Sequence, residues 1–176
     1  MEAGQKIRIR KPSFWSRRSG LFNEHGGKLG EFRMRSLFTY RKAEGEVGGR
    51  TLTLSYTGWT MRHSEMKDEW GHLVGSMYRG GWCGNKAQII LYEKEYEWKI
   101  NTWGTRFTVS ETNGTEVMRV VGCGGFGTRG EAEFKRSMDT NEAIELLYMG
   151  LYQMRLFEME VAASTAAAAG VVAAAA

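Results

Sequence analysis

Apolar and polar residues alternate along much of this chain, in short runs that are typical of β-strands. The first run is Lys6-Ile7-Arg8-Ile9-Arg10, in which every second residue is apolar. Further runs rich in β-branched and aromatic residues recur roughly every ten residues. They fall at residues 37–40, 51–56, 73–78, 88–92, 96–100, 106–109, 117–120 and 132–135. Their composition and spacing predict a mainly β fold.

Glycine closes several of the turns between these runs. Gly27, Gly71 and Gly114 each end a polar turn, after which the chain returns to apolar residues. The pair Asn113-Gly114, which lies between two alternating runs, is a strong signal for a tight β-hairpin. The same residues form an Asn-X-Thr sequon, and we interpret them as a hairpin rather than a glycosylation site.

The pattern changes near Asp139, where a helix is predicted. Residues 139–142 resemble a capping box, because Glu142 lies three residues after the side chain of Asp139. The helix continues through residues 143–157, and Glu145 is the only charged residue between Ala143 and Tyr152. A helix that is apolar on all sides must be surrounded by other elements.

We therefore predict a closed antiparallel β-barrel of about 10–12 strands wrapped around a single apolar C-terminal helix. Residues 1–160 would form this one domain, with the central helix at about residues 140–160. Residues 161–176 are an uncharged, alanine-rich tail of sixteen residues. Because a spanning helix needs roughly 20 residues, we expect a helical or frayed tail, and a tail anchor is the alternative.

Charge is distributed unevenly along the chain, although the net charge is only +4. Residues 1–42 contain eleven basic and three acidic residues, whereas the remainder contains 13 basic and 17 acidic residues. This excess indicates a polyanionic partner, namely lipid headgroups, nucleic acid or an acidic protein, and an ordinary solvated face is the alternative. The candidate lipid-binding residues are Arg8, Arg10, Lys11, Trp15, Arg17, Arg18, Arg33 and Arg35.

The sequence predicts no catalytic residue, metal site or cofactor. Residues 125–130 match the glycine pattern of dinucleotide-binding loops, but a strand-like run follows where that motif requires a helix. His63, Glu65, Asp68 and His72 are metal-ligand types, but they lack the helical spacing that presents two ligands on one face. We interpret them as solvated loop residues.

The cysteine content and the N-terminus suggest a cell compartment. Cys83 and Cys123 are too few for a disulfide scaffold, and residues 6–18 lack the apolar run of a secretory signal. We expect an intracellular, cytoplasmic protein that associates peripherally with membranes.

Several of these features together resemble the tubby C-terminal-like superfamily, which includes tubby proteins, phospholipid scramblases and LURP-one-related proteins. The features are the glycine-closed hairpin at residues 68–75, the aromatic strand pair at residues 96–100 and 103–109, and the apolar helix that follows. The resemblance covers roughly residues 20–160. It implies a twelve-stranded barrel around a central helix, and membrane or phosphoinositide association.

The chain also departs from this family. The helix carries Arg155 and two glutamates near its end, the alanine-rich tail has no counterpart, and no scramblase calcium motif is present. No phosphoinositide-binding residue is carried over. The resulting hypothesis is a non-enzymatic barrel that associates with anionic membrane lipid, which includes phosphoinositide, through its basic N-terminal region. The alternative is a structural or protein-interaction barrel, and nucleic-acid binding is a weaker third hypothesis.

Overall fold

The computed structural model describes residues 1–13, 16–35, 42–57, 62–80, 84–123 and 128–174, the last nine by their main chain only. These residues form twelve strands and then one helix, α1 (Thr140–Ala174). The strands are β1 (Lys6–Arg10), β2 (Arg18–Phe22), β3 (Lys28–Met34), β4 (Ala43–Val47), β5 (Arg50–Thr57), β6 (His63–Lys67), β7 (Leu73–Gly80), β8 (Lys86–Leu91), β9 (Lys94–Ile100), β10 (Arg106–Glu111), β11 (Glu116–Val121) and β12 (Arg129–Phe134).

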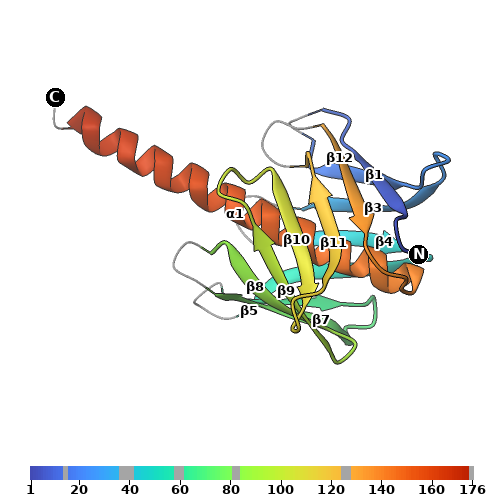
Figure 1. The fold of residues 1–176 in the computed structure, drawn as a ribbon. Coiled ribbons are helices and arrows are strands. Elements are labelled where there is room, and N and C mark those ends of the chain that lie inside the picture. The colour runs from blue at the N-terminus through green and yellow to red at the C-terminus, as the bar shows by residue number, and fades with distance from the viewer. Residues whose placement is uncertain (14–15, 36–41, 58–61, 81–83, 124–127, 175–176) are drawn as a thin grey trace.

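Each strand pairs antiparallel with the next one, and β12 pairs with β1 to close the barrel (Figure 1). The predicted closed antiparallel barrel with a single C-terminal helix is therefore confirmed. Closure matters physically because an open sheet presents unpaired backbone groups at its edges, and a barrel has no such edges.

Alternation along the strands sets which side chains line the interior. In β1, Ile7 and Ile9 are buried, whereas Arg8 and Arg10 are exposed on the outer surface. Strands β2, β3, β4 and β6 were not among the predicted runs, because glycine and charged residues interrupt their apolar pattern. The strand predicted at residues 37–40 lies outside the described residues.

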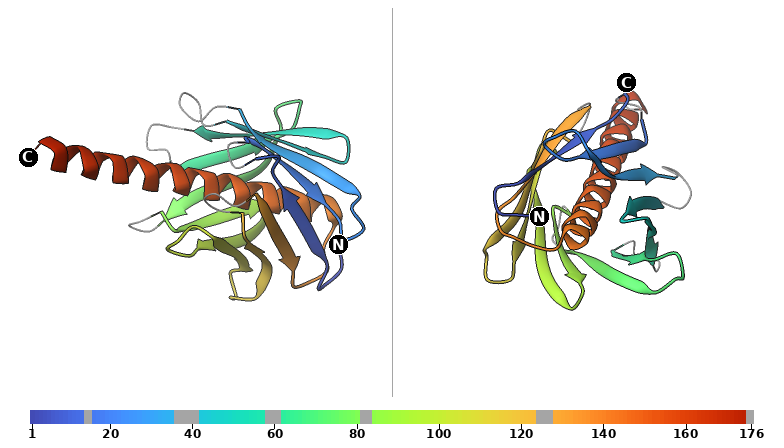
Figure 2. Two further views of the ribbon diagram at one scale, coloured as in Figure 1. Left: turned by 90° about the horizontal axis from the view of Figure 1, so that it is seen from above. Right: turned by 90° about the vertical axis from the view of Figure 1, so that its right-hand side faces the viewer.

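The helix α1 runs through the barrel and continues beyond it, as the left view of Figure 2 shows. Asp139 caps its start, because the side-chain Oδ1 accepts hydrogen bonds from the backbone N–H of Asn141 (2.8 Å) and of Glu142 (3.2 Å). Side chains on every face of α1 are buried between Ala143 and Met154. The prediction of a surrounded helix is therefore confirmed.

The two glutamates at the start of the helix are buried and paired. Glu145 is fully buried, and its carboxylate lies 2.9 Å from the guanidinium of Arg50. Burial nevertheless raises the pKa of Glu145 above its usual value. Glu142 accepts hydrogen bonds from Lys94 Nζ at 2.8 Å and from the hydroxyl of Tyr96 at 2.9 Å. These contacts tie the helix to the barrel wall.

Two strand glycines make room for a tyrosine of the helix. The Tyr148 hydroxyl donates a hydrogen bond to the backbone carbonyl of Glu46 at 2.5 Å, and the ring lies against β4. A Cβ at Gly45 would lie 2.5 Å from this ring, and one at Gly30 would lie 2.3 Å from the hydroxyl. Gly30 and Gly45, which interrupt the apolar alternation of β3 and β4 in the sequence, therefore contribute to the packing of the core.

Candidate functional site

The helix distinguishes the two ends of the barrel. It begins near the N-terminus, where the amino group of Met1 donates to the carbonyl of Met138 at 2.9 Å, and it leaves at the opposite end. Because strand direction alternates around the barrel, the odd-numbered strands end where α1 leaves and the even-numbered strands begin there. We call the residues within one position of these strand ends the exit rim, and those at the other end the entry rim.

Cations are concentrated at the exit rim. Among the described residues it holds one carboxylate, Glu44, and thirteen cations: Arg10, Lys11, Arg17, Arg18, Arg33, Arg35, Lys42, Arg62, Arg79, Lys86, Lys99, Arg106 and Arg129. The entry rim is balanced. It holds six cations (Lys6, Lys28, Arg50, Lys67, Lys94 and Lys135) and seven carboxylates (Glu46, Asp68, Glu93, Glu95, Glu111, Glu116 and Glu133). The protein is therefore polarised along the barrel axis.

Most of the exit-rim cations are exposed and form no ion pair with a carboxylate in the described part of the chain. Eleven are exposed, the exceptions being Lys11 and Arg79. Only three of the eleven form an ion pair with another described residue: Arg18 with Glu31 (3.9 Å), Arg35 with Glu44 (2.7 Å) and Lys99 with Glu97 (2.5 Å). The other eight are Arg10, Arg17, Arg33, Lys42, Arg62, Lys86, Arg106 and Arg129. This end of the barrel is therefore a strongly positive surface.

The strand register places like charges directly opposite one another at this rim. Three cationic pairs are cross-strand partners: Arg10 with Arg129, Arg18 with Arg33, and Lys86 with Lys99. Like charges directly opposite one another in a sheet are destabilising. Every such cationic pair within the described strands lies at the exit rim. The fold therefore carries an electrostatic cost there that a bound anion would relieve.

The structure gathers most of the predicted lipid-binding residues at this end. Six of them lie on the exit rim: Arg10, Lys11, Arg17, Arg18, Arg33 and Arg35. Arg8 is exposed on β1 but lies further from the rim, opposite Glu131 of β12. Trp15 lies outside the described residues. The predicted N-terminal set is thus largely a set of neighbours on adjacent strands.

Lys11 differs from the other predicted residues because it is buried. Its Nζ donates to the backbone carbonyl of Cys123 at 3.2 Å, and Arg155 of the helix donates to the same oxygen at 3.1 Å. Burial and the nearby charge of Arg155 lower the pKa of Lys11 to about 8. Burial likewise raises the pKa of the Cys123 thiol to about 12. Lys11 and Arg155 therefore connect the end of β1 and the helix through one shared carbonyl acceptor.

Sequence reasoning missed the exit-rim cations that lie outside residues 1–42. The exposed ones are Arg62, Lys86, Lys99, Arg106 and Arg129. Each lies at or next to the end of an odd-numbered strand or the beginning of an even-numbered one. That order was a usable signal, because in an up-and-down barrel these positions always share one rim.

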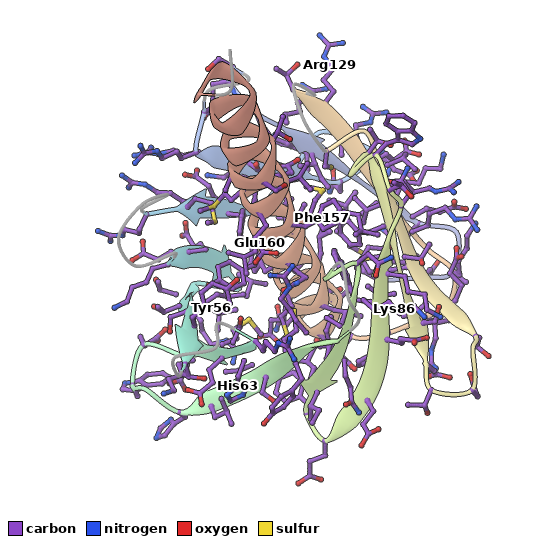
Figure 3. The ribbon with its side chains drawn as sticks, turned by 90° about the vertical axis from the view of Figure 1, so that its left-hand side faces the viewer. Tyr56, His63, Lys86, Arg129, Phe157 and Glu160 are labelled. Atoms are coloured by element: carbon purple, nitrogen blue, oxygen red, sulfur yellow. The ribbon has the colours of Figure 1, made fainter. Side chains whose placement is uncertain are left out.

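The helix leaves the barrel through the middle of the exit rim. Figure 3 looks at this end, with Arg129 and Lys86 at the periphery and Glu160 and Phe157 on the helix. Glu160 is neutralised by Arg79 of β7, whose second guanidinium nitrogen lies 2.8 Å from the carboxylate.

An exposed tryptophan lies in a loop beside this helix. The loop between β9 and β10 packs against the helix, because a Cβ at Gly104 would lie 3.6 Å from the Phe157 ring. The neighbouring Trp103 is 85% exposed. An aromatic side chain thus accompanies the cations of the exit rim.

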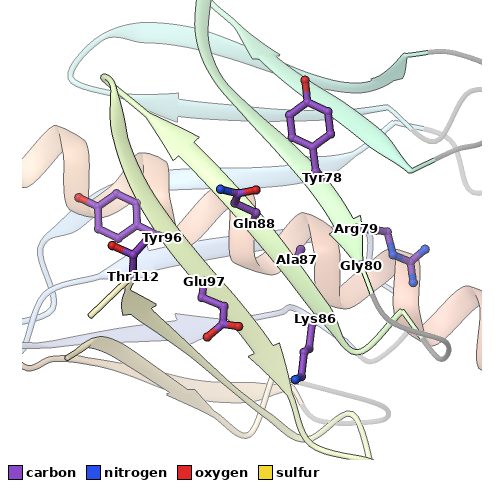
Figure 4. A pocket seen from close by; sticks show the side chains of 9 residues that line it. All are labelled: Tyr78, Arg79, Gly80, Lys86, Ala87, Gln88, Tyr96, Glu97 and Thr112. Carbon is purple, nitrogen blue, oxygen red and sulfur yellow. The ribbon is translucent and has the colours of Figure 1, made fainter. Parts of the chain in front are cut away.

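A surface groove crosses β7, β8 and β9 next to this rim (Figure 4). It has a volume of about 480 Å³ and is lined in part by Tyr78, Lys86, Gln88 and Glu97. The ring of Tyr78 stacks on His63 with centroids 4.3 Å apart. Arg79, Lys86 and Glu97 line the groove, and Arg79 is paired with Glu160, so the groove lacks the strong positive character of the rim.

The structure also places the candidate metal ligands. His63 contacts the Thr57 hydroxyl through Nδ1 at 2.6 Å, and His72 lies 3.1 Å from Asp68 in an exposed turn. Within the described parts of the chain, no three His, Cys, Asp or Glu side chains are grouped so as to hold a metal ion. In the same residues no helix combines the length and apolar character needed to cross a bilayer.

These observations define a closed twelve-stranded antiparallel barrel with an axial helix and one cationic end. No family model matches the sequence, and no curated protein matches it. The structure is similar to the X-ray structure of a protein from Arabidopsis thaliana, with a TM-score of 0.57 over 84% of this chain and 90% of that one. The two sequences are 12% identical, so the likeness extends to the fold alone.

Proposed function

We propose that the protein is a non-enzymatic barrel of the tubby C-terminal-like type that binds anionic membrane lipid, including phosphoinositide, through its exit rim. The observation that carries this proposal is the concentration of exposed cations at one end of the barrel, eight of which form no ion pair with another described residue. A cationic side chain near an anionic leaflet contributes about 1 kcal/mol of binding free energy. A few of these residues facing one surface would therefore give measurable binding.

The shape of this end favours a membrane over nucleic acid. The helix projects from the centre of the cationic ring, so a rigid duplex could not lie flat across it (Figure 3). A lipid surface is soft and can accommodate the projection. Trp103 supports the same interpretation, because exposed tryptophans are enriched at the membrane–water interface.

Vesicle sedimentation tests the proposal with two matched triple variants. The first, Arg10→Gln/Arg33→Gln/Arg129→Gln, removes three exposed exit-rim charges that form no ion pair with a described carboxylate. The control carries Lys28→Gln, Lys67→Gln and Lys135→Gln, which remove three charges from the entry rim. Vesicles of phosphatidylcholine alone are compared with vesicles that also contain phosphatidylserine or, at equal charge, a phosphoinositide.

We expect wild-type protein to bind the anionic vesicles and to be released by salt, because the Debye length is only about 10 Å at 0.1 M ionic strength. The exit-rim variant should bind on the order of 100-fold more weakly, whereas the control should bind as wild type does. Equal binding to neutral vesicles, or equal losses in both variants, would refute the proposal.

A second candidate function, binding of a protein partner, is favoured by apolar residues at the entry end. Trp70, Leu73 and Tyr92 are 70%, 59% and 46% exposed, and the last two line a common surface hollow of about 470 Å³. Exposed apolar patches of this kind mark protein interfaces. A protein retained by the wild type and by the exit-rim variant, but lost with Trp70→Ser/Leu73→Ser, would support this function.

A further inference from the structure

The helix continues for several turns beyond the barrel, and this part carries no charge. Residues 161–174 belong to α1, and none of them is Asp, Glu, Lys, Arg or His. At 1.5 Å per residue, these fourteen residues extend about 21 Å. We call this segment the extension. Its first five residues are exposed, among them Val161 with 47% exposure.

The change from charged to uncharged helix coincides with the plane of the exit rim. Glu158 and Glu160 are the last charged residues before the extension, and they pair with Arg155 and Arg79 respectively. Arg79 lies next to the last residue of β7, so Glu160 is at the level of the rim. The charged side chains of the helix are thus neutralised up to the surface that carries the cations, and residues 161–174 beyond it have no charged side chain.

The polar side chains at the start of the extension are satisfied within the helix. The Ser164 hydroxyl donates to the carbonyl of Val161 at 2.9 Å, and the Thr165 hydroxyl donates to the same oxygen at 2.8 Å. Such bonds allow serine and threonine to lie in hydrocarbon, where water cannot serve as their partner. A helix also satisfies its own backbone groups there.

From these observations we infer that the extension enters the hydrocarbon of the leaflet that the exit rim contacts, without crossing the bilayer. This inference rests on the proposed function. One leaflet provides about 15 Å of hydrocarbon, half of a core that is about 30 Å thick. The extension is long enough to traverse the headgroup region and reach the acyl chains, and too short to reach the opposite surface.

The cations around the helix and the docking of the rim both favour lipid as the environment of the extension. Because cations surround the point where the helix emerges, anionic headgroups would bind beside it and direct the extension into the leaflet. The extension has no barrel wall to pack against, so an environment without competing water would stabilise its backbone hydrogen bonds. Once the rim has docked, the extension is held next to the membrane, so its insertion is an intramolecular step with a high effective concentration. A weakly apolar helix is sufficient for such a step.

An environment-sensitive probe tests the inference. The fluorophore NBD is attached to Val171→Cys in a Cys83→Ser background, and Cys123 is retained because its buried thiol is unreactive. The matched control carries the probe at Glu93→Cys on the entry rim. Vesicles contain phosphatidylserine and phosphatidylcholine with a quencher at a shallow or a deep acyl position. Sedimentation of the same samples measures binding separately.

We expect NBD at position 171 to brighten several-fold and to be quenched most by the deep quencher. The probe at position 93 should not change. Adding Val172→Asp should abolish the deep quenching, because a charge in hydrocarbon is costly.

The outcomes separate the two proposals. Vesicle-bound protein whose position-171 probe remains in water would overturn the inference and leave the proposed function intact. Dimerisation through the extension in lipid-free solution, with the probe in water on vesicles, would also overturn it. Failure to sediment with anionic vesicles would instead refute the proposed function.

Discussion

The buried lysine at the end of β1 leads to a test of the barrel's electrostatics. Lys11→Met keeps a long, flexible side chain and removes its charge. In the native protein, burial and the charge of Arg155 lower the pKa of Lys11 to about 8, from 10.5 for an exposed lysine. The unfolded chain therefore binds more protons than the folded protein between pH 8 and 10.5. The stability of the wild type is reduced at pH 7 and recovers as pH rises through this interval.

The magnitude follows from the difference in pKa. One pH unit corresponds to about 1.36 kcal/mol, so the charged lysine costs on the order of 3 kcal/mol below pH 8. The variant loses the hydrogen bond from Lys11 to the Cys123 carbonyl, which is worth about 1 kcal/mol, although Arg155 still donates to that oxygen. We expect Lys11→Met to be about 2 kcal/mol more stable than wild type at pH 7.

Urea denaturation at pH 7.0, 8.5 and 10.0 measures the free energy of unfolding of both proteins. Other groups that titrate in this range, such as the Cys123 thiol, are common to both proteins and largely cancel in the difference. The advantage of the variant should shrink as pH rises, and an exposed control, Lys28→Met, should show no such trend. A difference that is independent of pH, or a wild type that is more stable at pH 7, would refute the reasoning.

Two further predictions concern the helix inside the barrel. Burial raises the pKa of Glu145, so the contribution of this group to the stability of the wild type should decrease as pH rises above 4.5. Glu145→Gln removes this contribution, so between pH 4.5 and 7 the unfolding free energy of the variant should change more favourably than that of the wild type, and the opposite difference would contradict this. Gly45→Ala should lower stability by roughly 1–3 kcal/mol, because its Cβ would lie 2.5 Å from the Tyr148 ring. Thermal unfolding beside Gly80→Ala, where a Cβ meets nothing within 4 Å, provides the control, and equal melting temperatures would contradict the packing argument.

The fold could be predicted because one element had few alternatives. Ten residues of helix with Glu145 as their only charge cannot face water, and the rest of the sequence offered only strands to cover them. The strands were predicted less completely. Gly30 and Gly45 interrupt the apolar pattern of β3 and β4. Glycine is needed at both positions because a side chain there would clash with Tyr148, which lies more than 100 residues later in the chain. Such a long-range contact leaves no local signal.

The candidate site could be predicted only in part. The sequence shows how charged residues are distributed along the chain, whereas in the folded protein positive and negative residues are separated along the barrel axis. The basic excess of residues 1–42 is divided between both ends, since Lys6 and Lys28 lie at the entry rim and Arg10 and Arg33 lie at the exit rim. The rest of the exit rim comes from distant strands, as with Arg129. Assigning strand direction before counting charge would have identified this rim.

The cross-strand cations at the exit rim are an arrangement that the proposed binding of an anionic surface would explain. A barrel that needed only solubility could alternate the signs of neighbouring charges, as Lys6 and Glu131 do near the entry rim, at 2.9 Å. Instead, the strand register places three pairs of cations directly opposite one another at the exit rim, and of these six residues only Arg18 and Lys99 form an ion pair with a described carboxylate. An anionic surface would reverse the sign of this contribution, because each additional cation would then strengthen binding. The rim is thus destabilised in isolation in the way that a binding surface for anions would be.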